Sequence, residues 1–172
     1  MLKLEYLEFT PSPNKEARTA KPQWIVLHCP SGTFQSAINT FKNPKNKVSA
    51  HYVVSKAGEI VCMVKPDLKA WHTLEFNNVS LGIEMEDGDA KDSKKNCKTD
   101  PTWCTDKQRE AVAELVATLM LKYNIPLEKV IGHNEPFLQK PPYNNNHTDP
   151  EKHWDWQKFR PLVKKHLEKG NG

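Results

Sequence analysis

The chain reads Val130-Ile131-Gly132-His133-Asn134-Glu135 in its last third, and this stretch decides the fold that we expect. Its short apolar run predicts a buried strand that places the imidazole of His133 at its end. Trp24-Ile25-Val26-Leu27-His28 has the same form, an apolar run followed by a histidine. Ligands in α/β sheets collect at the carboxyl ends of parallel strands. We therefore expect the two imidazoles to meet at one end of a sheet.

The rest of the chain alternates between strand and helix patterns. Further strands are expected at residues 49–55, 59–64 and 79–86. One helix is expected from Phe34 to before Pro44, a second from Thr105 to Asn124, and a third over about 155–169. The second helix is expected to begin with Thr105 as its N-cap and Gln108 completing a capping box. Lys56-Ala57-Gly58 predicts a hairpin turn, and Pro161 is expected to break or restart the first turn of the last helix. This mixture predicts one α/β domain with a central mixed β-sheet flanked by helices. We expect an extended N-terminal leader segment at 1–21 and the catalytic domain at 22–170.

Composition and charge exclude several classes of protein. The 172 residues carry a formal net charge of +4, and the lysines and arginines are scattered, so no nucleic-acid-binding track is expected. No stretch approaches the ~18 consecutive apolar residues of a membrane span. The first residues lack a basic start followed by an apolar core, so no signal peptide is expected in this chain. A modest positive field favours contact with an anionic polymer.

Four cysteines allow more than one arrangement. Cys97 and Cys104 are the two ends of the loop Cys97–Cys104, where a turn at Asp100-Pro101 can bring them together, so they either form a disulfide or remain as two reduced surface residues. Cys29 and Cys62 fall beside or within apolar runs and are expected to be small buried residues. No C-x-x-C pair occurs, which excludes a four-sulfur zinc site.

A three-ligand metal site is the chemistry that these residue types favour. His28 and His133 supply two imidazoles, and Asp149, 16 residues after His133 and just before Pro150, supplies a carboxylate. Two histidines and a carboxylate can hold a catalytic Zn²⁺ with one coordination position open. Taken singly, each residue has a plainer interpretation, because a strand-end histidine is often a hydrogen-bonded core residue and an aspartate before proline often forms a turn.

Such a site also needs a base and a group that stabilises an oxyanion. Glu84 and Glu86 share one face of the strand at 79–86, and Glu84 is the preferred base while Glu86 is its competitor. Two solvated carboxylates on an edge strand are the alternative. His147 lies two residues before Asp149 and can donate a hydrogen bond to a developing oxyanion.

Several short motifs follow one another in a defined order over about residues 22 to 162. They are Leu27-His28, Ser49-Ala50-His51-Tyr52, Ala70-Trp71-His72, Ser80-Leu81-Gly82-Ile83-Glu84, Gly132-His133 and Thr148-Asp149-Pro150 with Trp154-Asp155-Trp156 behind it. The ordered set resembles the zinc-dependent N-acetylmuramoyl-L-alanine amidases of the type-2 amidase family. That family also includes amidase-type phage lysozymes, cytosolic anhydro-muropeptide amidases and peptidoglycan recognition proteins.

The resemblance implies a role for each matching residue. It implies Zn²⁺ ligands at His28, His133 and Asp149, a catalytic glutamate at Glu84, and at His147 a histidine where many members carry a lysine. The groove or packing positions that it implies are Tyr52, Trp71 and His72, of which His72 can contact substrate, whereas His51 is expected in the core. Phe137 and Tyr143 are candidates to flank the sugar or peptide.

The resemblance implies a hydrolase that cleaves the amide between N-acetylmuramic acid and L-alanine in peptidoglycan or its fragments. We expect it to be a monomer. It leaves intact wall and soluble muropeptides equally open as substrates, and with them a secreted, periplasmic or lysis-released enzyme. One alternative is a peptidoglycan-binding module without turnover. Another is a hydrolase built on Cys29, which lacks a local feature that would make it a thiolate.

Overall fold

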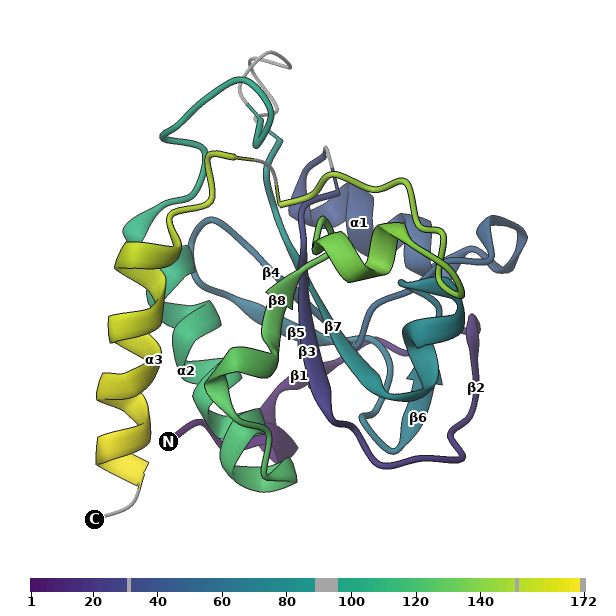
Figure 1. The fold of residues 1–172 in the computed structure, drawn as a ribbon, viewed down its shortest axis with the longest axis horizontal. Helices are drawn as coiled ribbons and strands as arrows, with labels where there is room; N and C mark the ends of the chain where they lie inside the picture. The colour runs from purple at the N-terminus through teal and green to yellow at the C-terminus, as the bar shows by residue number, and fades with distance from the viewer. Residues whose placement is uncertain (31, 89–95, 151, 171–172) are drawn as a thin grey trace.

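The structure, a computed structural model, describes residues 1–30, 32–88, 96–150 and 152–170. Within these residues a six-stranded sheet with the order β1-β5-β4-β7-β3-β8 forms the centre of the molecule (Figure 1). Its strands are β1 (Glu8–Phe9), β3 (Trp24–His28), β4 (Tyr52–Val54), β5 (Ile60–Cys62), β7 (Ser80–Met85) and β8 (Val130–Gly132). Within this sheet, β7 pairs in parallel with both β4 and β3, and β8 pairs in parallel with β3. Strand β5 is antiparallel to β4. The predicted α/β fold with a central mixed sheet is confirmed.

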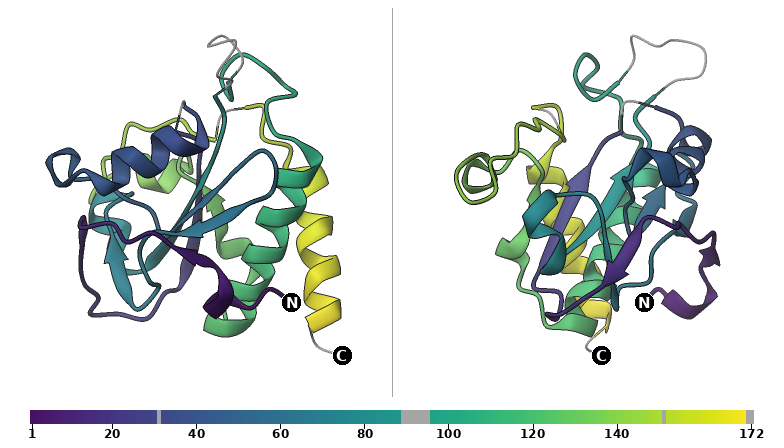
Figure 2. Two further views of the ribbon diagram at one scale, coloured as in Figure 1. Left: turned by 180° about the vertical axis from the view of Figure 1, so that it is seen from behind. Right: turned by 90° about the vertical axis from the view of Figure 1, so that its right-hand side faces the viewer.

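Helices cover both faces of this sheet (Figures 1 and 2). Helices α2 (Asp106–Tyr123) and α3 (Trp156–Gly170) pack together on one side, the α2 face, where they bury the larger core cluster. Helix α1 (Phe34–Lys42) lies on the other side, the α1 face, and packs on β4 and β5. Leu27 and Ile83 belong to the core of the α2 face. Because side chains alternate along a strand, His28 and Glu84 project from the α1 face.

Shorter elements complete the described part of the chain. A small antiparallel sheet pairs β2 (Lys15–Ala17) with β6 (Leu68–Ala70). The 3-10 helices are Leu4–Tyr6, Pro44–Asn46, Leu74–Asn78, Leu127–Lys129 and Pro136–Gln139. Part of the loop expected over 88–101, residues 89–95, lies outside the described residues. Among the residues described, no helix is both long and apolar enough to span a membrane.

The N-terminal segment packs on the sheet through backbone pairing. Strand β1 is parallel to β5 at the sheet edge, and β2 is antiparallel to β6. The guanidinium of Arg18 donates to the carbonyl oxygens of Leu68 at 3.0 Å and Ser80 at 2.9 Å, which ties this segment to two further strands. Residues 1–21 thus contribute strands to the domain, and a boundary between leader and catalytic domain at residue 21 stays a prediction.

Helix α2 begins and ends at the residues that the sequence indicates. The Thr105 side chain accepts a hydrogen bond from the Gln108 backbone N–H at 3.1 Å, and Asn124 ends the helix in the left-handed conformation. The Gln108 side chain does not complete the expected capping box. It donates to the carbonyl oxygens of Val54 and Glu86, so it links the helix to the sheet.

Helix α3 continues through Pro161, so the expected break or restart is wrong. Proline removes the hydrogen bond to the carbonyl four residues earlier, which here belongs to Gln157. Both residues are exposed, so water can solvate the free carbonyl. The apolar side of the helix, with Phe159 and Val163 buried, is unaffected.

Candidate active site

Two histidines meet at the carboxyl ends of adjacent parallel strands. His28 is the last residue of β3, and His133 directly follows β8 and donates its backbone N–H to the Leu27 carbonyl oxygen at 3.2 Å. Their ring centroids lie 4.4 Å apart at an interplanar angle of 69°. Both side chains are buried. The parallel pairing of β3 with β8 thus brings together two residues that are 105 positions apart in the chain.

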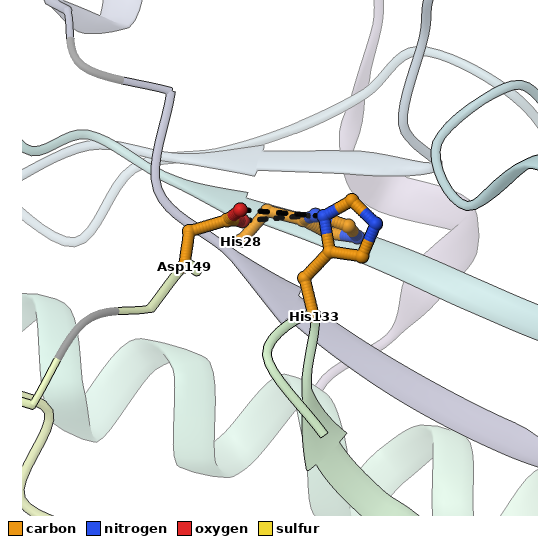
Figure 3. Close-up of side chains that lie close together, drawn as sticks. All are labelled: His28, His133 and Asp149. Atoms are coloured by element: carbon orange, nitrogen blue, oxygen red, sulfur yellow. Dashed lines mark ion pairs between the residues drawn. The ribbon is translucent and has the colours of Figure 1, made fainter. Parts of the chain in front are cut away.

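A loop carries Asp149 to this pair of imidazoles (Figure 3). Its Oδ2 lies 3.2 Å from Nδ1 of His28, and its Oδ1 lies 3.3 Å from Nδ1 of His133. The Asn134 backbone N–H donates to the Asp149 carbonyl oxygen at 2.9 Å, which holds the loop against the residue after His133. Gly132 permits this approach, because a Cβ there would lie 2.8 Å from Cδ of Pro150.

These three side chains fit a metal ion. One donor atom from each of His28, His133 and Asp149 lies within 4.8 Å of the other two. Both ring nitrogens of His133 are buried, and neither makes a hydrogen bond, because the 3.3 Å approach to Asp149 lacks hydrogen-bond geometry. A buried imidazole normally has a partner, and a cation between these donors would supply one.

The protonation states that the surroundings favour are those that a metal requires. Burial raises the pKa of Asp149, but polar contacts with His133, His147 and His28 outweigh burial and hold that pKa well below its usual range. The pKa of His133 is lowered to about 4, chiefly by burial and next by the nearby His28. At neutral pH, Asp149 is therefore ionised and His133 neutral, and these are the forms that bind metals.

Glu84 is the carboxylate beside these ligands. It lies on β7 as the register partner of His28 and lines the same pocket, which has a volume of about 490 Å³. Its pKa is raised to about 7, chiefly by burial, with an opposing effect of His28 and a smaller raising effect of Asp149. A carboxyl group with such a pKa can both take and return a proton near neutral pH.

Glu86, the competing base in the sequence, has a different task. One of its carboxylate oxygens accepts from the Phe34 backbone N–H at 3.0 Å, and the other accepts from the Lys56 backbone N–H at 2.8 Å. It therefore joins the start of α1 to the β4–β5 turn and does not line the pocket. These contacts favour Glu84 over Glu86 as the candidate base, and its catalytic role stays a prediction.

His147 is the exposed histidine of the group, with 62% of its side chain accessible. Its ring stacks on that of His133 with a centroid separation of 4.2 Å and an interplanar angle of 18°. Its Nδ1 lies 3.6 Å from Oδ1 of Asp149, and the contact with Asp149 raises the pKa of His147. The protonated ring is thus favoured next to the ligand cluster, open to a bound substrate.

A family model described as N-acetylmuramoyl-L-alanine amidase matches residues 18–152. The chain belongs to the type-2 amidase family. The match covers most of the domain and includes all the candidate ligands together with Glu84 and His147. The resemblance expected from the order of the motifs is confirmed.

Similar proteins agree with this assignment. N-acetylmuramoyl-L-alanine amidase A of Achromobacter lyticus is 35% identical to this amidase over 88 residues, and the match spans about half of each chain, 49% of both. The 1,6-anhydro-N-acetylmuramyl-L-alanine amidase AmpD of Salmonella typhimurium is 29% identical over 181 aligned positions, which cover 89% of this chain and 88% of the relative. The crystal structure of a Se-Met AmpD derivative superposes with a TM-score of 0.73 at 27% identity, covering 95% of this chain and 99% of the other.

Of the expected substrate-binding residues, Tyr52 does not reach the pocket of the amidase. It is the register partner of Ile83, and its neighbour Val53 is the partner of Glu84. Because side chains alternate across a sheet, Tyr52 projects from the α2 face, where it is 1% exposed within the core. The substrate-binding role expected for Tyr52 has no support in the structure.

Trp71 and His72 both line the pocket of the amidase, so their predicted contact with substrate stays a prediction. Burial lowers the pKa of His72 well below its usual range, which keeps the ring neutral. The expected core residue His51 is fully buried. Lys47 and Lys98 also line the pocket, and no local pattern in the sequence singles them out.

Phe137 and Tyr143 pack among other aromatic side chains, and a contact of either with the sugar or peptide stays a prediction. Phe137 stacks against Trp24 at a centroid distance of 5.3 Å and against Phe76 at 5.7 Å, and Tyr143 contacts Phe76 at 5.2 Å. They cover the end of a small core cluster around Val26 and do not line the pocket.

The cysteines of the amidase pair differently from either expected arrangement. Cys29 forms a disulfide with Cys97, while Cys62 and Cys104 are free and buried. The Asp87 carboxylate accepts hydrogen bonds from the backbone N–H groups of Gly32 and Cys97, which places the two bonded cysteines side by side. Cys29, Asp87 and Cys97 also cluster closely enough to hold a metal, but in the disulfide both sulfurs are already bonded.

Proposed function

We propose that this amidase hydrolyses the amide between the lactyl group of N-acetylmuramic acid and L-alanine, with a Zn²⁺ ion held by His28, His133 and Asp149. The observation that carries the proposal is the convergence of two imidazole nitrogens and a carboxylate next to Glu84. Zinc in such a site polarises a carbonyl and lowers the pKa of water toward neutrality. The proton transfers and the stabilisation of the oxyanion are assigned to side chains of this chain.

Glu84 is the proposed general base and acid. Its pKa of about 7 leaves a substantial fraction ionised at neutral pH, ready to take a proton from the attacking water. Once protonated, it can deliver that proton to the nitrogen of the leaving L-alanine. Amide cleavage needs both transfers, because without the delivered proton the nitrogen would have to leave as an amide anion.

His147 is the proposed donor to the oxyanion. Its ring is exposed at the pocket, and the contact with Asp149 favours the protonated form. A charged donor next to the reacting carbonyl stabilises the negative charge that develops on the carbonyl oxygen. Its place two residues before a ligand, with its ring stacked on His133, keeps this donor close to the metal site.

The proposed partner is peptidoglycan or a muropeptide released from it, and we expect the amidase to act as a monomer. The pocket is open and has both polar and apolar lining, as a substrate made of sugar and peptide requires. The name of the Salmonella relative refers to 1,6-anhydro-N-acetylmuramyl-L-alanine as the group on which that enzyme acts. Both substrate forms therefore belong in the experiment.

Two observations favour an enzyme over a binding module without turnover. All three ligand positions carry donors, and a carboxyl group with a raised pKa stands beside them. A binding module needs neither. The second alternative, a hydrolase with a Cys29 nucleophile, is contradicted by the disulfide, which occupies the sulfur.

The test is digestion of purified sacculi and of soluble anhydro-muropeptide, each with zinc-loaded enzyme and with enzyme stripped by a chelator. We expect free stem peptides with an N-terminal L-alanine, identified by mass, only with the loaded enzyme, and recovery of activity when zinc is returned. The His133→Ala variant is the matched control, and zinc should not restore it. Undiminished cleavage after metal removal would overturn the proposal, and binding of sacculi without any cleavage would favour the binding module.

A further inference from the structure

The far side of the His28 ring makes a contact that neither the ligand set nor the catalytic pair explains. While Nδ1 of His28 faces Asp149, its Nε2 lies 3.0 Å from Nδ1 of His72. The Nε2 atom of His72 lies 3.3 Å from Oγ of Ser80, and that hydroxyl donates to the Phe76 carbonyl oxygen at 2.8 Å. These contacts form a continuous chain from the candidate metal site to a backbone carbonyl.

The direction of donation along this chain is determined by its two ends. The Phe76 carbonyl oxygen can only accept, so the Ser80 hydroxyl donates to it and accepts from Nε2–H of His72. Nδ1 of His72 is then the free acceptor for Nε2–H of His28. An imidazole that binds a metal through Nδ1 must carry its proton on Nε2, and this chain accommodates that tautomer.

The neighbouring hydroxyl of Thr73 does not compete for this role. It lies 3.3 Å from Oγ of Ser80 but donates its own hydrogen to Oδ1 of Asn77. The same amide oxygen accepts from the backbone N–H of His72 at 2.8 Å, which fixes the backbone that carries the ring.

Packing against Gly82, His28 and His51 holds the His72 ring in place. A Cβ at position 82 would lie 2.7 Å from Cγ and Nδ1 of His72, so Gly82 on β7 provides the space in which the ring sits. The ring meets His28 edge-on, at a centroid distance of 5.1 Å, and His51 similarly at 5.6 Å. A ring enclosed on these sides has little freedom to turn toward a substrate.

We propose that His72 is a positioning residue, which accepts the Nε2–H of His28 and holds that ring with Nδ1 directed at the metal, while Ser80 fixes the tautomer of His72. This inference rests on the proposed zinc site. It assigns to His72 a role behind a ligand, which differs from the contact with substrate that the sequence suggests. Loss of such an outer partner typically weakens metal binding about 10–100-fold.

Asparagine and leucine provide a matched pair of replacements for His72. They have nearly the same shape, but only asparagine offers an oxygen where Nδ1 of histidine stands. We expect His72→Leu to raise the Kd for zinc about 10-fold or more and His72→Asn to stay within about threefold of wild type. Competition with a chromophoric zinc chelator measures the Kd, and thermal unfolding shows that each variant is folded.

A spectroscopic measurement separates positioning from a general structural role. In ¹H–¹⁵N spectra of the zinc-loaded protein, we expect the ring Nε2–H of His28 to be shielded from exchange with water in wild type and in His72→Asn. In His72→Leu the same proton loses its acceptor and should exchange faster. Ser80→Ala should weaken zinc binding less than His72→Leu, and Ser55→Ala, at a buried serine remote from the site, should leave the Kd unchanged.

The outcomes distinguish this inference from the proposed function. If wild type binds zinc and the two His72 variants have equal Kd values, the positioning role is overturned while the zinc site stands. A raised KM for muropeptide in His72→Leu with an unchanged zinc Kd would also overturn it, in favour of substrate contact. Failure of wild type to bind zinc would overturn the proposed function and this role together.

Discussion

His28 and Glu84 are register partners on the adjacent parallel strands β3 and β7. Partners in a parallel pair project from the same face of the sheet, so the candidate ligand and the candidate base stand side by side without help from any loop. His133 joins them through the pairing of β3 with β8. Three of the residues proposed for catalysis are thus held by paired strands of the central sheet, and Asp149 and His147 lie on a loop.

Replacing Glu84 with glutamine should stop turnover and spare metal binding. The amide has the same shape but cannot take a proton from water, so we expect kcat to fall about 10²–10⁴-fold. The zinc content should stay at the wild-type level, because Glu84 is not among the three ligands. Glu86→Gln is the control, since Glu86 holds backbone N–H groups outside the pocket, and its kcat should change little. Equal losses in the two variants would contradict the role of Glu84.

The pH dependence of kcat should report on His147. A histidine donates as a cation only below its pKa, and the contact with Asp149 raises that pKa. Activity should therefore fall as the pH rises through this pKa. In His147→Lys the fall should move to higher pH, because lysine stays protonated longer. His147→Ala should lose about 10²-fold or more in kcat at a pH below this pKa, and its deficit should shrink above it. A decline at the same pH in wild type and His147→Lys would count against the oxyanion role.

The Cys29–Cys97 disulfide should stabilise the fold measurably. It closes a loop with a sequence separation of 68 residues, and a link of this kind typically contributes about 2–4 kcal/mol. We expect a reductant to lower the unfolding free energy of wild type by this amount and to leave a Cys29→Ala/Cys97→Ala double variant unchanged. Mass analysis after alkylation of the denatured, unreduced protein should find two modified cysteines, Cys62 and Cys104. Four modified cysteines would show that the bond is absent.

Acid should destabilise the fold partly through His51. The pKa of this histidine is lowered to about 3, chiefly by burial and next by Arg18, whereas in the unfolded chain it titrates near 6.5. The unfolded chain therefore binds the proton first, and stability is lost as the pH falls from about 6.5 toward 3, by up to about 1.4 kcal/mol per pH unit. Urea unfolding at a series of pH values checks this. His51→Asn keeps an acceptor for the Gly82 N–H and should show a shallower loss, and parallel curves would contradict the assignment.

Local sequence patterns were sufficient to predict a helix or strand wherever the interaction that determines it lies within that element. The apolar runs ending in His28 and His133 form the expected strands, and Thr105 and Asn124 bound α2. The order of the motifs was sufficient for the family, because that order depends on the chain alone. Pro161 did not follow its local rule, since an exposed position in α3 lets water replace the missing hydrogen bond.

Strand register and long-range pairing decided the features that local sequence patterns could not predict. The face on which Tyr52 lies depends on its pairing with Ile83, and a shift of one residue would reverse it. The choice of Glu84 over Glu86 depends on backbone N–H groups contributed by Phe34 and Lys56, and the partner of Cys97 depends on how Asp87 gathers two distant segments.

The sequence by itself determined the elements, the family and which side chains can bind a metal, because these follow from the periodicity and order of residues along the chain. Only the tertiary structure decided that His28, His133 and Asp149 share one centre, that Glu84 stands beside it, and that His72 lies behind His28. Such contacts join residues tens of positions apart, and they exist only once the strands have paired in a single register.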